Sequence, residues 1–421
     1  MKKMYLFIVP LLLLNCTKTE IKEVEKIVTV TETETLVTTQ IVTNTVTVVN
    51  SPEEYSFTRN GISTVFYTGQ TDRLKMATEL KTALNLTSSS QTKLNNMFNN
   101  GTDFSDPLLN ASGKKVGNKT AASDPASATV KPLFDGWITE FTSVVIPAVN
   151  SSIIASSGVA GSIANSGASR TVKVNSKGLE LNQVFSKGLI GALQVDQIVN
   201  KYLSFAKLES SNARQDNDGG IKGYKLSDQV TNTITRMEHY WDEGFGYLQG
   251  LDNQYSPGLG DPSVGRDTAN LNYYLRKVNA QTNEAGITKR IYDAFIFGRA
   301  AIVAKKYDER DRQAAIISAE LSKVIGYKAQ SYLRDAAEII DDTDVVEWAD
   351  ALHALSEAYG FILGLQFTKT SDGTPYLTNA EVNELLDELS AGTGGFWDRT
   401  PAELRTMADE LQQITGLSVP E

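Results

Sequence analysis

Two histidine–glutamate pairs are the residues of this chain best suited to chemistry. His239 and Glu243 are four positions apart, as are His353 and Glu357, and the chain has two histidines in all. The second pair follows the first by 114 positions (353 − 239). Around the pairs the sequence reads MEHYWDEGFGYLQG and HALSEAYGFILG, with matching aromatic and glycine positions. This recurrence predicts an internal duplication.

Each copy forms a stripe when it is read as a helix. The shared His, Glu and two glycines fall at i, i+4, i+7 and i+11, which is one helical face. The glycines are Gly246 and Gly250 in the first copy, and Gly360 and Gly364 in the second. Glycine costs about 1 kcal/mol per helical position relative to alanine, so its repetition indicates close packing or a site. We expect the two helices to meet.

A meeting of the two stripes would bring two imidazoles and several carboxylates together. Bundle proteins build metal sites in this way from facing helices, and this ligand set suits iron or zinc better than calcium. The expected ligands are His239, Glu243, His353 and Glu357, with Asp242 and Glu238 as alternative or supporting groups.

Other functions fit the same residues. An i, i+4 His–Glu pair also makes an ordinary hydrogen bond, and a histidine among glycines and aromatics can be a satisfied core residue. A hydrolase is a third possibility, although the chain has no HExxH motif and no catalytic cysteine–histidine arrangement. We therefore do not expect an enzyme.

The amino terminus predicts export and lipidation. Lys2 and Lys3 precede an apolar run over 4–14 that is too short for a permanent membrane span and fits a signal peptide. The run ends in Leu13-Leu14-Asn15-Cys16, which resembles a bacterial lipoprotein signal, and Cys16 is the only cysteine. We expect a lipid anchor on Cys16 in the outer membrane, with the domain facing the periplasm or the cell surface.

Composition narrows the class of partner and the organisation of the chain. The net charge of −10 argues against a nucleic-acid partner, and 41% hydrophobic residues can form a sizeable core. The run 17–50 is rich in Thr, Val and Glu, without Gly or Pro, and reads as an extended tether. The expected organisation is a signal peptide at 1–15, the lipidated cysteine and tether at 16–54, and a duplicated domain at 55–421, with halves at about 55–275 and 276–421.

Apolar periodicity predicts an all-α bundle over this domain. The Ser/Gly-rich run 156–170 reads as a loop, and an Asn60-Gly61 turn joins two short β-like runs. The expected helices cover 70–84, 179–203, 237–250, 287–303, 312–335, 344–367, 379–389 and 401–415.

Two resemblances extend these predictions. The motif EHYWDE followed by GFGY, residues 238–247, resembles a group of Gram-negative lipoproteins of unassigned function. The second copy, HALSEAYGFILGLQF, is similar to a late helix of imelysin-type proteins, which are all-α, internally duplicated and tied to iron uptake. The spacing around His239 and His353 departs from the imelysin signature GxHxxE. The resemblance therefore implies the fold and the iron context more than the ligand set.

Together these observations predict an outer-membrane lipoprotein that is imelysin-like and binds iron or haem during acquisition, beside an outer-membrane transporter. The alternative is a non-catalytic surface interaction lipoprotein whose His/Glu stripes are structural, and a metallopeptidase-like hydrolase is third.

Overall fold

The structure, a computed structural model, describes residues 49–220, 234–252, 267–342 and 345–420. The predicted signal peptide, Cys16 and the tether up to residue 48 lie outside these ranges. In the part that is described, we find no helix with the length and apolar character needed to cross a membrane.

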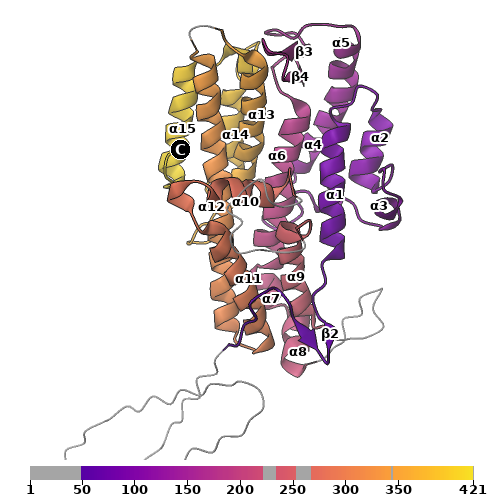
Figure 1. Cartoon of the computed structure of the whole chain (residues 1–421), viewed down its shortest axis with the longest axis vertical. Coiled ribbons are helices and arrows are strands. Elements are labelled where there is room, and N and C mark those ends of the chain that lie inside the picture. The colour runs from indigo at the N-terminus through magenta and orange to yellow at the C-terminus, as the bar shows by residue number, and fades with distance from the viewer. Residues whose placement is uncertain (1–48, 221–233, 253–266, 343–344, 421) are drawn as a thin grey trace, which may run out of the picture.

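The chain is mostly helical, as predicted, and its long helices run along the long axis of an elongated bundle (Figure 1). The helices in chain order are α1 (Thr68–Ala83), α2 (Gln91–Asn95), α3 (Pro107–Ala111), α4 (Val130–Glu140), α5 (Ile146–Asn150), α6 (Leu181–Leu189), α7 (Phe205–Leu208), α8 (Ser211–Gly219), α9 (Arg236–Gln249), α10 (Leu271–Asn279), α11 (Ile287–Val303), α12 (Tyr307–Ile340), α13 (Trp348–Gly364), α14 (Asn379–Leu389) and α15 (Pro401–Thr415).

Helix boundaries follow the capping chemistry of the sequence. Helices α11, α14 and α15 cover the predicted ranges. Thr378 and Thr400 each form a capping box with the glutamate three residues later, so two orphan backbone N–H groups at each start are satisfied. The 34-residue α12 extends well beyond its predicted range and packs against α11, α13 and α15. Helix α12 therefore holds three other long helices together in the bundle.

The helix predicted at 179–203 is α-helical in its first part and π-helical in its second part. Helix α6 continues directly into a π-helix, η4 (Ile190–Tyr202). Its buried Gln194 accepts a hydrogen bond from the backbone N–H of Leu271 and donates one to Asn270. The buried Asp196 accepts hydrogen bonds from the backbone and side chain of Ser123. Long π-helical runs are rare, and hydrophobic periodicity does not distinguish them from α-helix.

Two small hairpins complete the ordered structure. Strands β1 (Thr58–Arg59) and β2 (Ile62–Ser63) are joined by the predicted turn, with positive φ at Asn60 and Gly61. Strands β3 (Gly161–Ala164) and β4 (Thr171–Val174) pair antiparallel across the run that was predicted to be a loop. The loop prediction is wrong for 161–164, because β3 is held by its pairing with β4, whose Val172 and Val174 are buried just outside the run, and the Ser/Gly-rich composition gives no local strand signal.

The expected meeting of the two stripe helices is not found among the described residues. Helix α9 packs mainly on η4, α8, α11 and α1, whereas α13 packs mainly on α12, α6 and η4. Figure 1 shows α13 in the upper half of the bundle and α9 in the lower half. Each stripe therefore serves a different packing interface.

The glycines of the stripes allow close approach, as predicted, but to other helices. A Cβ at Gly191 would lie 2.4 Å from the Cα of Gly364, and one at Gly360 would lie 2.4 Å from the Cβ of Lys187. In the lower half, a Cβ at Gly246 would lie 2.4 Å from the Cβ of Tyr67. The helix that faces α13 is thus α6 with its continuation η4, and the segment that faces Gly246 is the start of α1.

We expect Gly191→Ala to lower the free energy of unfolding by about 1–3 kcal/mol, because the added methyl group meets backbone rather than a mobile side chain. The matched control is Gly136→Ala in α4, where a Cβ meets nothing within 4 Å and the change should raise stability by up to about 1 kcal/mol. Urea unfolding followed by circular dichroism measures both. Equal effects of the two substitutions would contradict the proposed close approach.

Candidate functional site

The six predicted ligands lie on two helices and fall into three separate groups. Helix α9 carries Glu238, His239, Asp242 and Glu243, and α13 carries His353 and Glu357. Within the described ranges, no group of three or more His, Cys, Asp or Glu side chains is placed to hold a metal ion. The single convergent site that the sequence predicts is therefore not formed.

The His353 cluster lies between α6 and α13. The Nδ1 atom of His353 lies 2.7 Å from Oε2 of Glu180, a buried carboxylate at the start of α6. In the neutral imidazole, Nδ1–H donates to this carboxylate, so the lone pair is on Nε2. Nε2 faces Oε1 of Glu357 at 3.7 Å, which is beyond hydrogen-bonding distance. The His353 side chain keeps 20% of its surface exposed, whereas the Glu357 side chain keeps 8%.

Glu357 is the centre of the cluster. Its Oε1 lies 3.0 Å from Nζ of Lys187, which is fully buried, and 3.3 Å from the hydroxyl of Tyr274. Tyr332 also hydrogen-bonds to this carboxylate. Burial alone would raise the pKa of Glu357, but the charge of Lys187 and hydrogen bonds from Tyr332 and Lys187 help to outweigh it, and the pKa is held at about 2. Glu357 is therefore ionised throughout the physiological range.

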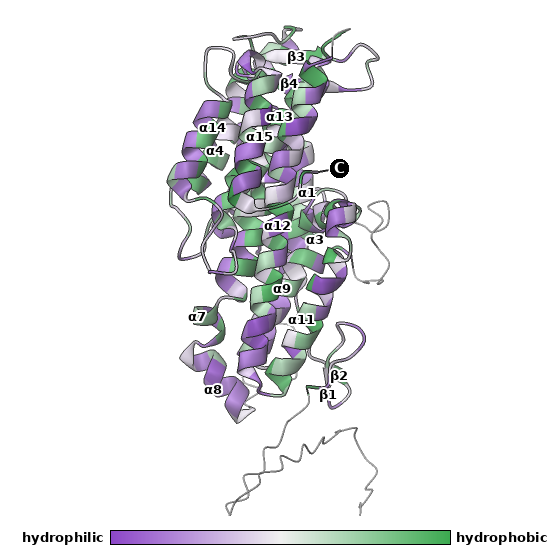
Figure 2. Cartoon of the chain, turned by 90° about the vertical axis from the view of Figure 1, so that its left-hand side faces the viewer, coloured by the Kyte–Doolittle hydropathy of each residue, from purple (hydrophilic) through white to green (hydrophobic). Residues whose placement is uncertain are grey.

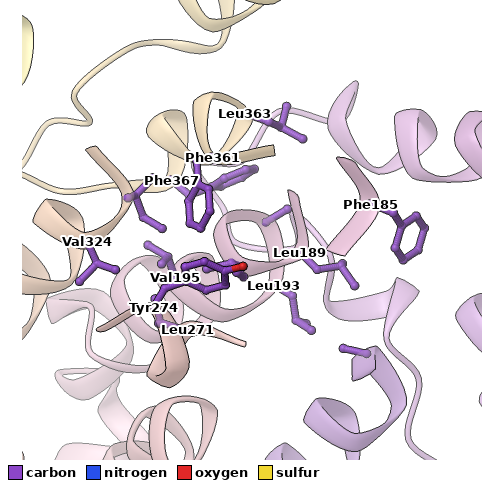
Figure 3. Close-up of a cluster of buried hydrophobic side chains, with 14 of the residues drawn as sticks. Phe185, Leu189, Leu193, Val195, Leu271, Tyr274, Val324, Phe361, Leu363 and Phe367 are labelled. Carbon is purple, nitrogen blue, oxygen red and sulfur yellow. The ribbon is translucent and has the colours of Figure 1, made fainter. Parts of the chain in front are cut away.

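Apolar side chains line one side of the His353 cluster. Tyr274 extends into a group of buried hydrophobic side chains that includes Phe361, Val324 and Leu271 (Figure 3). Its ring meets Phe361 edge to face, with the centroids 4.9 Å apart. The phenol oxygen is thus held in place by packing and directed at Glu357.

The His239 cluster repeats part of this arrangement in the lower half. Nε2 of His239 faces Oε2 of Glu243 at 3.7 Å. Glu243 accepts a hydrogen bond of 2.9 Å from Gln70 and another from the phenol of Tyr202. Burial lowers the pKa of His239, although Glu243 and a hydrogen bond to the backbone of Phe66 partly oppose this. The imidazole is neutral at pH 7, which is the form that ligates metals.

Glu238 and Asp242 belong instead to a fully buried ion-pair network around Arg299, which we call the Arg299 network. Arg299 donates to Glu238 at 3.0 Å and to Asp242 at 3.1 Å. Arg59 donates twice more to Glu238, and the hydroxyl of Tyr55 donates to Asp242 at 2.7 Å. These contacts join α9 and α11 to the segment before α1. The network occupies the carboxylate oxygens that the sequence assigned to supporting ligands.

Several site residues are missed by sequence reasoning about the two stripes. Lys187, Tyr274 and Tyr332 come from α6, α10 and α12, and none of them shares a motif with His353. A weak signal exists for Lys187, because it directly precedes Gly188 and lies seven positions after Glu180 on one face of a helix. Tyr274 and Tyr332 have no such signal.

Replacing Arg299 tests how much the Arg299 network contributes to the free energy of unfolding. We expect Arg299→Met to lower the free energy of unfolding by about 3–5 kcal/mol, because the buried Asp242 loses its guanidinium partner and the buried Glu238 keeps only Arg59. Lys289→Met is the control, since its ion pair with Asp293 is exposed and contributes less than about 1 kcal/mol. Chemical unfolding measures both. A loss no larger than that of the control would contradict the assigned role.

The pH dependence of stability tests the environment of Asp242. Burial raises its pKa to about 7, even though Arg299 and two hydrogen bonds oppose the shift. The folded state then holds a proton that the unfolded state loses near pH 4, so the stabilisation is present at low pH and is lost as the pH rises through 7. Relative to Asp242→Asn, the wild type should lose on the order of 4 kcal/mol between pH 4 and pH 8. Thermal unfolding across this range measures the difference, and a flat difference would show an ordinary pKa.

The fold and the site define a class of predominantly helical protein with buried charged clusters between its helices. The chain belongs to the family described as Domain of unknown function (DUF4856), whose model matches residues 52–418. Comparisons with curated proteins and with solved structures give no match.

Proposed function

We propose that the protein is an outer-membrane lipoprotein that binds iron during acquisition and catalyses no reaction, and that its two His/Glu pairs serve as two separate metal sites. Iron remains the expected ligand, as in the prediction from sequence. The single site shared by both helices is replaced by one site in each half of the bundle. The His353 cluster is the more complete of the two.

One observation carries the proposal. In both clusters the imidazole Nε2 faces a glutamate oxygen at 3.7 Å, outside hydrogen-bonding range. Two ligand atoms bound to one metal at about 2.0–2.2 Å are separated by about 3–4 Å, depending on the bond angle. The pairs thus have the separation of two ligands that share a cation.

The surroundings of each pair favour a hard, oxygen-binding transition metal. Glu180 orients His353 through Nδ1, which is the usual support of a metal-bound histidine. The phenols of Tyr274 and Tyr332 contact Glu357, and that of Tyr202 contacts Glu243. Burial and the neighbouring glutamates raise the pKa of these phenols, so they stay protonated and hold the carboxylates by hydrogen bonds. Imidazole with carboxylate suits iron or zinc.

Three sequence features support the cellular context. The recurrence of the stripe supports an internal duplication, and its similarity to imelysin-type proteins supports a role in iron uptake. The lipoprotein-like signal ending at Cys16 and the tether after it support anchoring in the outer membrane, beside a transporter that takes the iron.

The second candidate function is a non-catalytic surface interaction lipoprotein with structural His/Glu stripes. The observation that favours it is the pairing of each glutamate within the protein, Glu357 with Lys187 and Glu243 with Gln70. These contacts satisfy the carboxylates without any metal.

Metal titration of the detergent-solubilised full chain separates the two functions. We expect two equivalents of iron(III), measured by elemental analysis after dialysis and by calorimetry. His353→Ala and His239→Ala should each remove one equivalent, because each deletes one nitrogen ligand. The double variant should remove both while circular dichroism stays unchanged.

Asp293→Asn, which alters an exposed carboxylate on α11, is the control and should bind as the wild type does. If the wild type binds no metal and the histidine variants only unfold at lower temperature, the interaction lipoprotein is the better function.

A further inference from the structure

The first described residues of the chain lie in a groove between α11 and α12, which we call the α11–α12 groove. Two cavities follow one another along it, of about 940 and about 610 Å³. Val49 lines the larger cavity and residues 51–53 line the smaller one, while Phe297 of α11 lines both. The chain therefore passes from one cavity to the other beside Phe297, in the lower half of the bundle (Figure 1).

Residues 49–54 contact the groove at every third position. Val49 and Pro52 are partly buried, whereas the other four residues of the segment are exposed. The spacing continues to the partly buried Tyr55, and no helix or strand of the described chain begins before β1. A contact face that recurs every three residues has the period of a polyproline II helix, and proline has the φ of that conformation. The segment thus shows that the groove accepts an extended chain.

Aromatic rings line the larger cavity. Phe205 of α7, Phe297 of α11 and Tyr307 of α12 all contribute to its wall, and Phe205 is 66% exposed. The volume of about 940 Å³ remains open with Val49 in place. Segments in the polyproline II conformation dock in grooves that are lined with aromatic rings. The larger cavity can therefore take an apolar side chain bigger than valine.

Charge distinguishes the two ends of the groove. The wall of the larger cavity carries four basic and four acidic side chains, so its charges balance. The wall of the smaller cavity carries Lys289 and Arg290 with one carboxylate, Asp293, and Glu53 of the segment reaches this same cavity. An occupant that matches both ends is apolar at the first and acidic at the second.

Residues 49–54 are held less firmly than the residue that follows them. Four of the six are exposed to solvent. Tyr55, in contrast, is fixed, because its hydroxyl donates to Asp242 at 2.7 Å and its ring stacks on Phe245 with the centroids 3.7 Å apart. Departure of residues 49–54 from the groove therefore leaves the Arg299 network intact.

We propose that the α11–α12 groove is a docking site for an extended segment of a partner protein, and that residues 49–54 occupy it until that partner binds. The partner segment carries apolar side chains at every third position, the first of them large, followed by acidic residues that face Lys289 and Arg290. The chain's own segment is then an intrachain competitor, which lowers the apparent affinity for the partner. This inference does not depend on the two metal sites.

The experiment uses the detergent-solubilised full chain and a capped synthetic peptide as the probe. The peptide has the sequence of residues 49–54, with the photoreactive aromatic residue benzoylphenylalanine at the position of Val49. Irradiation followed by mass spectrometry of proteolytic fragments measures how much of the chain is labelled, and where. We expect the label in α7, in α11 and at the start of α12, because these helices line the larger cavity. A peptide with glycine in place of its proline should label more weakly.

Variants of the chain test the competition and the site. Val49→Asp with Pro52→Gly should raise the labelling at least fivefold over the wild type, because the chain's own segment is released from the groove. Adding Phe205→Asp to this released variant should lower the labelling at least threefold, because it places a charge in the aromatic cavity. Phe205 is mostly exposed, so the fold should be kept, and circular dichroism checks this.

Ile154→Asp, added to the released variant, is the matched control. Ile154 is 75% exposed and pairs with Ser162 of β3, at the opposite end of the bundle (Figure 1). It should leave the labelling unchanged.

The other outcomes overturn the proposal. They are equal labelling of the wild type and the released variant, labelling that Phe205→Asp does not lower, labelling outside the groove, and no labelling at all. If the released variant forms a dimer by light scattering and the peptide does not dissociate it, the occupant is a second copy of the chain and the partner protein is excluded.

Discussion

Burial of charge is the constraint on which this structure depends. A fully buried ion requires a partner, and removing one member of a buried pair costs far more than removing an exposed one. Arg299 forms ion pairs with Glu238 and Asp242 in the lower half, and Lys187 forms an ion pair with Glu357 in the upper half. Each pair joins different helices, so the ion pairs determine which helices can be neighbours as well as contributing to stability.

The glycines of the stripes have no side chain, so the helices approach closely enough for these ion pairs to form. Gly191 and Gly364 touch through their Cα atoms, and Gly360 receives the stem of Lys187, whose ammonium group then reaches Glu357. In the lower half Gly298 receives the indole of Trp241, whose N–H donates to the carbonyl of Phe295. In each stripe, one helix face carries both the glycines that allow close packing and the histidine and glutamate side chains. Helix α8, at the lower end of the bundle, is largely hydrophilic by contrast (Figure 2).

The upper cluster is the more complete of the two proposed metal sites because of one physical feature. Ordered donors and acceptors from α6, α10, α12 and α13 converge on Glu357, and the apolar wall around Tyr274 excludes water from one side. These groups are already ordered by packing and hydrogen bonds, so the proposed metal site would need little further ordering on binding. The buried ion pair between Lys187 and Glu357 distinguishes this cluster from the cluster at His239, where Glu243 is held by Gln70.

Local sequence was sufficient to predict several of the long helices and the first hairpin, but not the second hairpin, the π-helix η4 or the site. Helical periodicity and capping residues determined α11, α14 and α15, and Asn60-Gly61 determined the first hairpin, because these signals act within a few residues. The i, i+4 spacing also determined that His239 faces Glu243 and His353 faces Glu357. Only the tertiary structure decided that the two stripes lie in different halves of the bundle, and that Glu180, Lys187, Tyr274 and Tyr332 complete the His353 cluster. Those contacts join residues far apart in the chain. Periodicity in the sequence indicates which face of a helix is buried, but not which other helix packs against that face.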